Sequence, residues 1–522
     1  MEAKGVVAAG HPQTARAAEE ILLAGGNAFD AALSGMCAAC ATEPMLCSLG
    51  GGGHMLASRG RDAPVAYDFF VHTPVERPSG ESDFREVFCD FGPASQPFNI
   101  GLGSIATPGV VRGLFEIHRE LGSMPIRDVV APAIALAREG VEVSALHAYI
   151  FRVVESIFMA SAAARSTYCS PRDSALLIGE GELHRQPELA DTLDVLAIEG
   201  DDLFYRGEIA QAIDRQCRDG GGSLTLRDMD GYRVERHRPL AADYRGVRML
   251  TMPPPSSGGT LIVFALKLLE AVRDLGSIPF GSTEQMGIIA EVLGLSDRAR
   301  VEVLVEGSSH IDAGTLLDDE LLERYRQQIK GRAAAFRGTT SLAVIDSREN
   351  VATLSFSNGE GCGEMVPGTG LMLNNMLGEE DLVPQGFHRW PVDQRMTSMM
   401  APSMLLFSDG RLVATGSGGS KRIRTAILHV MLNLIDYGTS VEEAVNRPRI
   451  FLENGHLSVE GGYDTAQVER LVEHYPEHRV WDEVNLFFGG AHTVERRRGS
   501  GFAGAGDPRR AGVCRVAGSR PA

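Results

Sequence analysis

RGTTSLAVID, residues 337–346, stands where the pattern of the chain changes from helical to extended. Its second half, Leu342 to Asp346, is an apolar run of strand length. A similar run, Val351 to Phe356, follows after Ser-Arg-Glu-Asn, which has the length and chemistry of a hairpin turn. The stretch therefore predicts that a β-hairpin starts at the bond between Gly338 and Thr339.

The part of the chain before this hairpin has helical apolar spacing. Thr14 to Ala24 reads as a helix that stops on Gly25 and Gly26, because glycine is the common residue just past a helix C-terminus. Asn27 then begins an alanine-rich helix that runs to Ala41. Pro108 to Glu120 and Ile126 to Arg138 have the same character. Helices on both sides of the hairpins indicate an α/β fold with strands packed between helix layers.

A second predicted hairpin leads into a glycine-rich turn. This hairpin has Asp409-Gly410 as its turn, flanked by the strand-like runs Met404 to Phe407 and Arg411 to Thr415. The glycine-rich turn is Gly416 to Ser420, and an amphipathic helix over 423–437 follows it. Backbone N–H groups at such a turn can hold a phosphate or a developing oxyanion. The phosphate-loop pattern fails here, because Lys421 is followed by arginine. A plain turn and an oxyanion-binding turn remain equally good interpretations of this segment.

Composition excludes several classes of function. The chain has 522 residues, a formal charge of -18 and an isoelectric point near 5.3, so it repels nucleic acid. The longest small and apolar run, Ala31 to Ala41, is well short of the ~20 residues that cross a membrane, and no leader is visible. We expect a soluble, cytoplasmic protein, or an exported one if the sequence has been trimmed. Arg496 to Arg498 and the pair Arg509, Arg510 are expected in solvated turns.

The cysteines and histidines show no metal-ligand spacing. Cys37 and Cys40 form a C-x-x-C inside an alanine-rich helical pattern and are best interpreted as small core residues. Neither a metal nor a cofactor is expected.

Thr339 is a candidate nucleophile of a particular kind. A threonine hydroxyl needs a base, and a threonine at an amino terminus carries one in its own α-amine, whose pKa is roughly 7.7 to 8. Making that amine requires breaking the Gly338–Thr339 bond, and glycine permits the unusual dihedrals of such a scission. On these residues alone, an ordinary strand start is the better interpretation.

Several longer segments resemble, in the same order, the γ-glutamyltranspeptidase (glutathione hydrolase) family. They are GHPQTARAAEEILLAGGNAFDAALSGMCAACATEPMLCSLGGGGHML, ATPGVVRGLFEIHRELG, APAIALAREG, YRGVRMLTMPPPSSGGTLI, SMMAPSMLLFSDG, NLIDYGTSVEEAVNRPRI, FFGGAHTV and DPRR. Each segment is modest evidence alone, but the set spans nearly the whole chain and is highly specific.

The resemblance implies an αββα N-terminal-nucleophile hydrolase made as a precursor. Residues 1–338 would form a large subunit and residues 339–522 a small one, together one intertwined domain and a heterodimer from one chain. The resemblance makes Gly338–Thr339 the self-cleavage bond and Thr339 the nucleophile. Ser357 takes the place of a threonine that contacts the nucleophile, and Gly419 and Ser420 match the oxyanion turn. Thr397 and Ser398 match the hydroxyls that hold a substrate α-carboxylate.

Other positions depart from the family pattern. Phe70 stands where the family has the arginine that pairs with the substrate carboxylate, and a phenyl ring cannot form that ion pair. Glu379 occupies one of two aspartate positions, so it is only a candidate for binding the substrate α-ammonium. The family asparagine is displaced by one residue to Asn358, and Ser341 replaces a histidine. The reaction class is therefore better supported than the substrate.

Three functions remain open. The first is a threonine amide hydrolase or acyltransferase acting on γ-glutamyl amides such as glutathione or its conjugates, with water or an amine as acceptor. The second is an acylase of another acyl amide, similar to cephalosporin and glutaryl acylases, which Phe70 and Val71 favour. The third is an unprocessed homologue without enzymatic activity.

Overall fold

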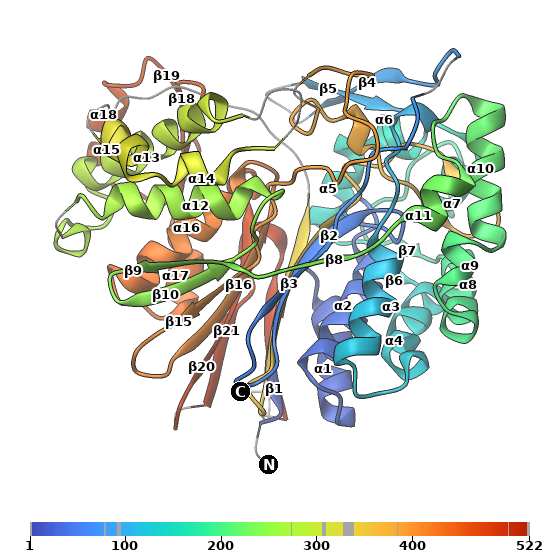
Figure 1. Cartoon of the computed structure of the whole chain (residues 1–522), viewed down its shortest axis with the longest axis horizontal. Coiled ribbons are helices and arrows are strands. Elements are labelled where there is room, and N and C mark those ends of the chain that lie inside the picture. The colour runs from blue at the N-terminus through green and yellow to red at the C-terminus, as the bar shows by residue number, and fades with distance from the viewer. Residues whose placement is uncertain are drawn as a thin grey trace.

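The structure is a computed structural model of the chain. The structure describes residues 3–77, 80–90, 95–272, 274–304, 310–326, 339–383, 385–499 and 501–518. It is a mixed α/β structure in which two large sheets lie between two groups of helices (Figure 1). Gly338, on the amino side of the predicted cleavage bond, lies outside the described residues.

Each large sheet combines strands from both sides of residue 339. The seven-stranded sheet has the order β22 (Val513–Ala517), β1 (Gly5–Ala9), β11 (Thr340–Asp346), β12 (Val351–Ser357), β2 (Gly52–Ser58), β3 (Val65–Phe69), β8 (Glu235–His237). The six-stranded sheet has the order β21 (Gly501–Ala505), β20 (Gly490–Arg497), β16 (Leu412–Gly418), β15 (Ser403–Leu406), β10 (Val247–Thr251), β9 (Leu240–Tyr244). Strands from the two parts of the chain are thus hydrogen-bonded to each other in both sheets.

Three apolar clusters hold these layers together. The first joins the seven-stranded sheet to helices that include α1 (Pro12–Ala24), α2 (Ala28–Thr42), α3 (Val110–Leu121), α4 (Ile126–Glu139) and α8 (Pro187–Glu199). The second joins the six-stranded sheet to α12 (Ser257–Leu269), α13 (Thr283–Glu302), α16 (Arg422–Ile435) and α17 (Val441–Asn446). The third is smaller and takes its residues from strands of both sheets, as Val6 and Ala414 show. Because both faces of this sheet are covered, β11 and β12 are buried along their whole length.

The predicted helix boundaries are confirmed where the sequence carries capping signals. Gly25 ends α1 in the left-handed region, with φ of 101°. Asn27 caps α2 and forms a reciprocal capping box with Asp30. The predicted hairpin is also confirmed, since β11 and β12 pair in antiparallel register.

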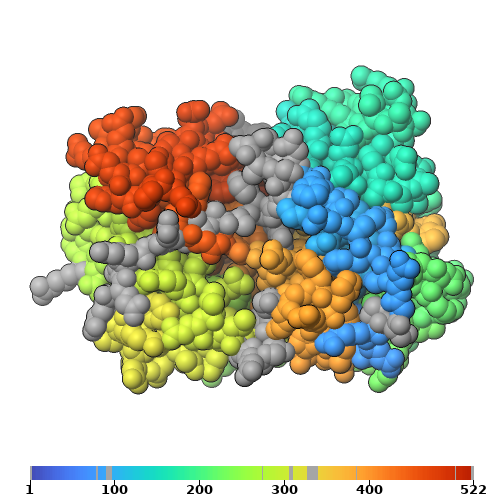
Figure 2. All heavy atoms as spheres, turned by 90° about the horizontal axis from the view of Figure 1, so that it is seen from above, coloured from blue at the N-terminus to red at the C-terminus, as the bar shows by residue number. Residues whose placement is uncertain are grey.

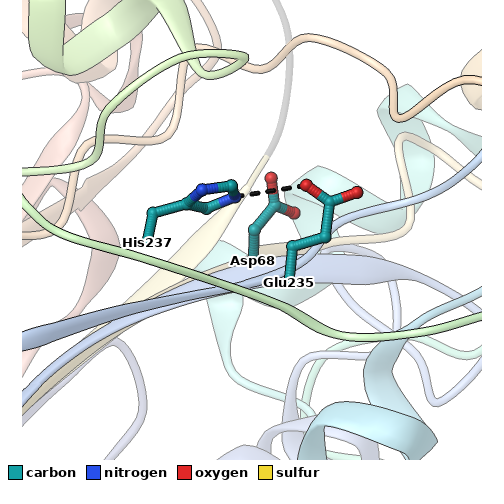
Figure 3. Close-up of side chains that lie close together, drawn as sticks. All are labelled: Asp68, Glu235 and His237. Carbon is teal, nitrogen blue, oxygen red and sulfur yellow. Dashed lines mark ion pairs between the residues drawn. The ribbon is translucent and has the colours of Figure 1, made fainter.

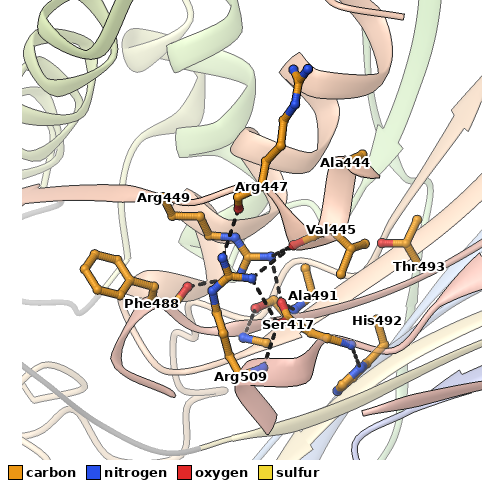
Figure 4. Close-up of polar contacts among 12 residues, drawn as sticks. Ser417, Ala444, Val445, Arg447, Arg449, Phe488, Ala491, His492, Thr493 and Arg509 are labelled. Atoms are coloured by element: carbon orange, nitrogen blue, oxygen red, sulfur yellow. Dashed lines mark hydrogen bonds and ion pairs between the residues drawn. The ribbon is translucent and has the colours of Figure 1, made fainter. Parts of the chain in front are cut away.

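The prediction for Arg509 and Arg510 was wrong, because both side chains are buried. Arg509 pairs with Glu460 and Asp507, and Arg449 pairs with Asp507 from the other side. Figure 4 shows the two guanidinium groups of Arg449 and Arg509 packed together among backbone carbonyls. A local reading of charge cannot reveal carboxylates that come from distant elements. Arg496 and Arg497 are the last two residues of β20, and their side chains are partly exposed, which is closer to the solvated turn expected for them.

No helix in the described part of the chain is both long enough and apolar enough to span a bilayer. Seen from above, segments far apart in sequence meet at the surface: orange residues from the part after Thr339 lie beside blue residues from the first part of the chain (Figure 2).

Candidate active site

Strand register brings the two predicted catalytic hydroxyls together. β11 pairs Thr340 with Phe356, so the next position along the ladder sets Thr339 beside Ser357 at the end of the hairpin's strands. Both residues are buried, with Thr339 only 4% exposed. The Ser357 hydroxyl accepts a hydrogen bond from the Gly359 N–H at 3.0 Å. The hairpin that the sequence predicts is therefore also what positions the candidate nucleophile.

The run of four glycines at the start of β2, residues 50–53, allows a close approach of two other segments. A Cβ atom on Gly51 would overlap the backbone of Ser357, and one on Gly52 would lie 2.6 Å from the backbone nitrogen of Val71. Both distances are shorter than real Cβ contacts allow. The glycines thus let the Ser357 end of β12 and the Phe70–Val71 segment lie on either side of β2.

The turn between β16 and α16 faces the candidate nucleophile. A Cβ atom on Gly418 would overlap the Thr339 carbonyl group, so this strand passes directly against the start of β11. Gly419 has φ of 116° and Ser420 has φ of 50°. A serine in the left-handed region carries local strain, which proteins keep mostly where function needs the geometry. Among the two interpretations of this turn, its position against Thr339 favours oxyanion binding.

One small cavity brings six of the predicted site residues together. Its volume is about 30 Å³. The lining residues are Phe70, Thr339, Ser357, Met376, Glu379, Asp381, Leu382, Ser398, Met399, Met400, Ser420 and Ile423.

Thr397, Asn358 and Gly419 do not line this cavity, but each is next in sequence to a residue that does. Thr397 donates its hydroxyl to the Pro255 carbonyl at 2.8 Å. Ser398 is held through its own carbonyl, which accepts from the Ser257 N–H at 2.9 Å. Asn358 is buried and its side-chain nitrogen faces the Leu373 carbonyl at 3.5 Å. The PPPSSGG segment thus supports the loop that carries Thr397 and Ser398.

Asp381 is a site residue that the sequence reasoning missed. It belongs to the acidic run Glu379-Glu380-Asp381, which was the available signal. In the structure Asp381 lines the cavity and pairs with Lys421, 2.9 Å away. Lys421 also pairs with the buried carboxylate of Glu453 at 2.5 Å. The acidic side of the cavity is therefore partly neutralised from behind, by a lysine that directly follows Ser420.

A buried ionic group holds Phe70 in its place. The Phe70 N–H donates to Asp68 at 2.9 Å, and its carbonyl accepts from the Tyr232 hydroxyl at 2.6 Å and from Arg395. The ring stacks on His54, with 5.5 Å between centroids. These contacts fix the backbone and one face of the ring, so the phenyl group forms a firm apolar part of the cavity wall.

The same region contains a group of three side chains that could hold a metal ion. Asp68, Glu235 and His237 place possible ligand atoms within 4.8 Å of one another (Figure 3). Arg395 Nε lies 3.4 Å from Asp68 and 3.6 Å from Glu235, however, so a guanidinium already balances these carboxylates. A metal ion here would meet that positive charge at close range. We therefore interpret the set as the ion-pair support of Phe70.

Comparison with known sequences gives matches along most of the chain. The sequence profile described as "Gamma-glutamyltranspeptidase" matches residues 14–517. "Acylase ACY 1 proenzyme" of Pseudomonas sp. (strain SE83) is 31% identical over 494 residues, covering 90% of this chain and 86% of that protein. "Glutathione hydrolase proenzyme" of Bacillus subtilis (strain 168) is 29% identical over 481 residues, covering 86% of this chain and 80% of that protein.

Comparison with solved structures supports the same fold. The crystal structure of cephalosporin acylase from Bacillus halodurans superposes with a TM-score of 0.83 at 24% identity, covering 98% of this chain and 96% of that one. The crystal structure of Helicobacter pylori gamma-glutamyltranspeptidase gives a TM-score of 0.53 at 25% identity, covering 62% of this chain and 91% of that one.

Proposed function

The chain belongs to the gamma-glutamyltranspeptidase family of amide hydrolases, and we propose that it cuts itself before Thr339 and then hydrolyses or transfers an acyl group through that threonine. The "proenzyme" in the names of two relatives supports the self-processing step. We further infer an αββα order of layers, with the large and small subunits remaining together because both sheets mix strands from the two parts.

In this mechanism the reacting groups and the oxyanion donors come from residues at or just beyond the ends of strands. After cleavage, the Thr339 α-amine takes the proton of its own hydroxyl, and the oxygen attacks the carbonyl carbon of the substrate amide. Backbone N–H groups of the Gly419–Ser420 turn stabilise the tetrahedral oxyanion. The amine leaves with a proton returned from the Thr339 ammonium, and water or another amine then takes the acyl group. Ser357 orients the Thr339 hydroxyl.

The proposed donor is an acyl amide without a carboxylate at the far end of its chain. The observation that carries this choice is Phe70, which lines the same cavity as Thr339, Ser357 and Ser420. Among the described lining residues none is an arginine or lysine, whereas Met376, Leu382, Met399, Met400 and Ile423 add apolar surface. A carboxylate placed there would lose water without gaining a charged partner. The acylase name of one relative fits this choice.

A γ-glutamyl donor is the second candidate, supported by a different set of residues. Glu379 and Asp381 offer carboxylates to a substrate ammonium, and Ser398 offers a hydroxyl to a substrate carboxylate. These groups could hold an α-amino acid end even without an arginine, though more weakly.

Four p-nitroanilides separate the two candidates, because they differ only in the groups at issue. The γ-glutamyl amide carries amine and carboxylate, the glutaryl amide only the carboxylate, the 4-aminobutyryl amide only the amine, and the butyryl amide neither. We expect kcat/KM to be higher for the two amides without a carboxylate. A clear preference for the γ-glutamyl amide over all three others would establish the second candidate.

Thr339→Ala serves as the control for uncatalysed release of p-nitroaniline. A wild-type chain that stays whole and releases none from any of the four amides would instead support the homologue without activity.

A further inference from the structure

Glu43 is a buried carboxyl that contacts the strand of the candidate nucleophile. It follows α2 directly and is 2% exposed. Its Oε2 accepts a hydrogen bond from the Thr340 hydroxyl at 2.8 Å, and its Oε1 accepts one from the Thr14 hydroxyl at 3.3 Å. The carboxyl group is therefore fixed against the residue next to Thr339, and the catalytic steps described above make no use of it.

The packing around Glu43 depends on a glycine. A Cβ atom on Gly10 would lie 2.8 Å from Glu43 Oε2, 3.3 Å from Thr340 Oγ1 and 3.3 Å from His492 Nε2. Three polar atoms from three separate elements thus surround one point beside the start of β11. The absence of a side chain at residue 10 is what lets them approach one another.

The titratable neighbours of Glu43 come from every side of this point. They are Cys47 in the loop after α2, His492 on β20 and Arg510 at the end of the short helix η5 (Pro508–Arg510), and His11 at the start of α1 directly follows Gly10 in the chain. Burial lowers the pKa of His11 to about 3 and that of His492 to about 4. His147, whose ring lies 5.0 Å from that of His11, has its pKa lowered to about 4 by burial.

These histidines are therefore uncharged near neutral pH, and burial keeps the Cys47 thiol protonated by raising its pKa. Burial raises the pKa of Glu43 to about 7, against the opposing effects of its hydrogen bonds from Thr340 and Thr14 and of the charge of Arg510. In the uncut chain, Glu43 is thus a carboxyl group close to its midpoint at neutral pH.

Self-cleavage would change the charge beside this carboxyl. It hydrolyses the Gly338–Thr339 amide, which leaves a carboxylate on Gly338 and converts the uncharged amide nitrogen of Thr339 into an α-amine that is an ammonium below a pKa of roughly 7.7 to 8. We propose that Glu43 is a positioning residue that stabilises this ammonium through its contact with Thr340, and so sets the pH above which the Thr339 amine can act as a base. The inference rests on the proposed cleavage before Thr339.

The proton balance of the step is simple. Carboxylic acid and free amine become carboxylate and ammonium when one proton passes from the first to the second, directly or through solvent. Raising the pH removes one proton from the ammonium to give the active amine, and the nearby carboxylate opposes this loss. Arg510 limits the effect, because its charge already favours the carboxylate and its Nη2 also lies 3.3 Å from where a Cβ of Gly419 would stand.

Glu43→Gln tests the proposal through a pH profile. The amide keeps the size of the side chain and an oxygen for Thr340 but cannot carry the charge. The acid limb of kcat/KM against pH for the processed enzyme should move to lower pH by about half a unit to one unit. Glu43→Asp, which retains a carboxylate, should move the limb less. An unchanged acid limb in Glu43→Gln would overturn the proposal.

Asp436→Asn is the matched control. Asp436 is also a buried carboxyl, its pKa is raised to about 6 by burial, and it accepts hydrogen bonds from the Tyr244 hydroxyl. It lies at the end of α16 away from Thr339, so its removal should leave the acid limb in place. A shift of equal size in Asp436→Asn would show a general effect of buried charge and would overturn the specific role of Glu43.

Two further results separate this inference from the proposed function. If Glu43→Gln does not fold, Thr340→Val tests the same contact, because loss of the hydroxyl raises the Glu43 pKa and should shift the limb in the same direction. A wild-type chain that is never cleaved would overturn both the proposed function and the inference. A cleaved, active enzyme whose acid limb is the same in wild type, Glu43→Gln and Thr340→Val would overturn the inference alone.

Discussion

Two walls of one cavity are built in different ways. The proposed catalytic wall consists of Thr339, Ser357 and Ser420, which lie at the ends of β11 and β12 and in the turn after β16, with Gly419 next to Ser420 in that turn. The acyl wall consists of Phe70, Glu379, Asp381 and Ser398, which lie in segments outside the regular strands of the large sheets. Strand register and backbone dihedrals define the first wall, whereas side-chain identity defines the second. The chemistry can therefore stay constant while substrate choice changes.

The largest expected effect comes from the catalytic wall. Thr339→Ala removes the hydroxyl that attacks in both self-cleavage and turnover, so both should be abolished. Thr339→Ser keeps a hydroxyl and should retain part of each activity. Denaturing gel electrophoresis and p-nitroaniline release measure the two. An alanine variant that is cut and active would show that Thr339 is not the nucleophile.

A smaller loss is expected from the oxyanion turn. Gly419→Ala places a Cβ at φ of 116°, 3.1 Å from the Gly489 Cα, and should displace the turn. Loss of one oxyanion donor typically lowers kcat by about 10² to 10³. Gly438→Ala is the control: its φ of 59° is also positive, but no atom lies within 4 Å of the added Cβ. Equal activity in the two variants would remove the turn from the catalytic wall.

On the acyl wall, Phe70→Arg should change selectivity more than rate. A guanidinium in the cavity can pair with a substrate carboxylate, so kcat/KM for the γ-glutamyl and glutaryl amides should rise about tenfold relative to the butyryl amide. Phe70→Leu changes the volume without adding charge and should leave that ratio unchanged. If Phe70→Arg does not alter the ratio, the carboxylate of the substrate does not approach this wall.

The last effect is on stability rather than on catalysis, and it comes from Glu43, behind the catalytic wall. Because the pKa of Glu43 is raised from 4.5 to about 7 in the uncut folded chain, the folded state holds this proton more tightly than the unfolded state. Its contribution to stability is full below pH 4.5 and is lost as the pH rises to about 7. Glu43→Gln cannot titrate at this position. The free energy of unfolding of the variant should therefore rise relative to that of the parent chain by roughly 3 kcal/mol between those two pH values.

Urea unfolding at a series of pH values measures this difference, with both chains carrying Thr339→Ala to keep them uncut. A free-energy difference that is constant across the pH range would show that Glu43 titrates normally in the folded chain.

The catalytic wall could be predicted from the sequence better than the acyl wall. The hairpin after Thr339 is readable because apolar runs and turn residues report strand pairing locally. The direction of a side chain in a loop depends on contacts with segments that are distant in sequence, so the local pattern does not predict it. Thr397 and Ser398 are adjacent, yet Thr397 bonds to Pro255 and Ser398 faces the cavity. Residues that meet only in the fold, such as Glu43, Thr340 and Arg510, gave no signal, and Arg510 was wrongly expected in solvent.

The most direct test of the proposed function is the intact mass of freshly purified protein under denaturing conditions, with Thr339→Ala beside it. The account predicts two wild-type fragments of about 36 and 20 kDa from the 56.1 kDa chain, the smaller one beginning with Thr339, and a single 56.1 kDa species for the variant. A wild-type chain that remains at 56.1 kDa on incubation would contradict the N-terminal threonine mechanism.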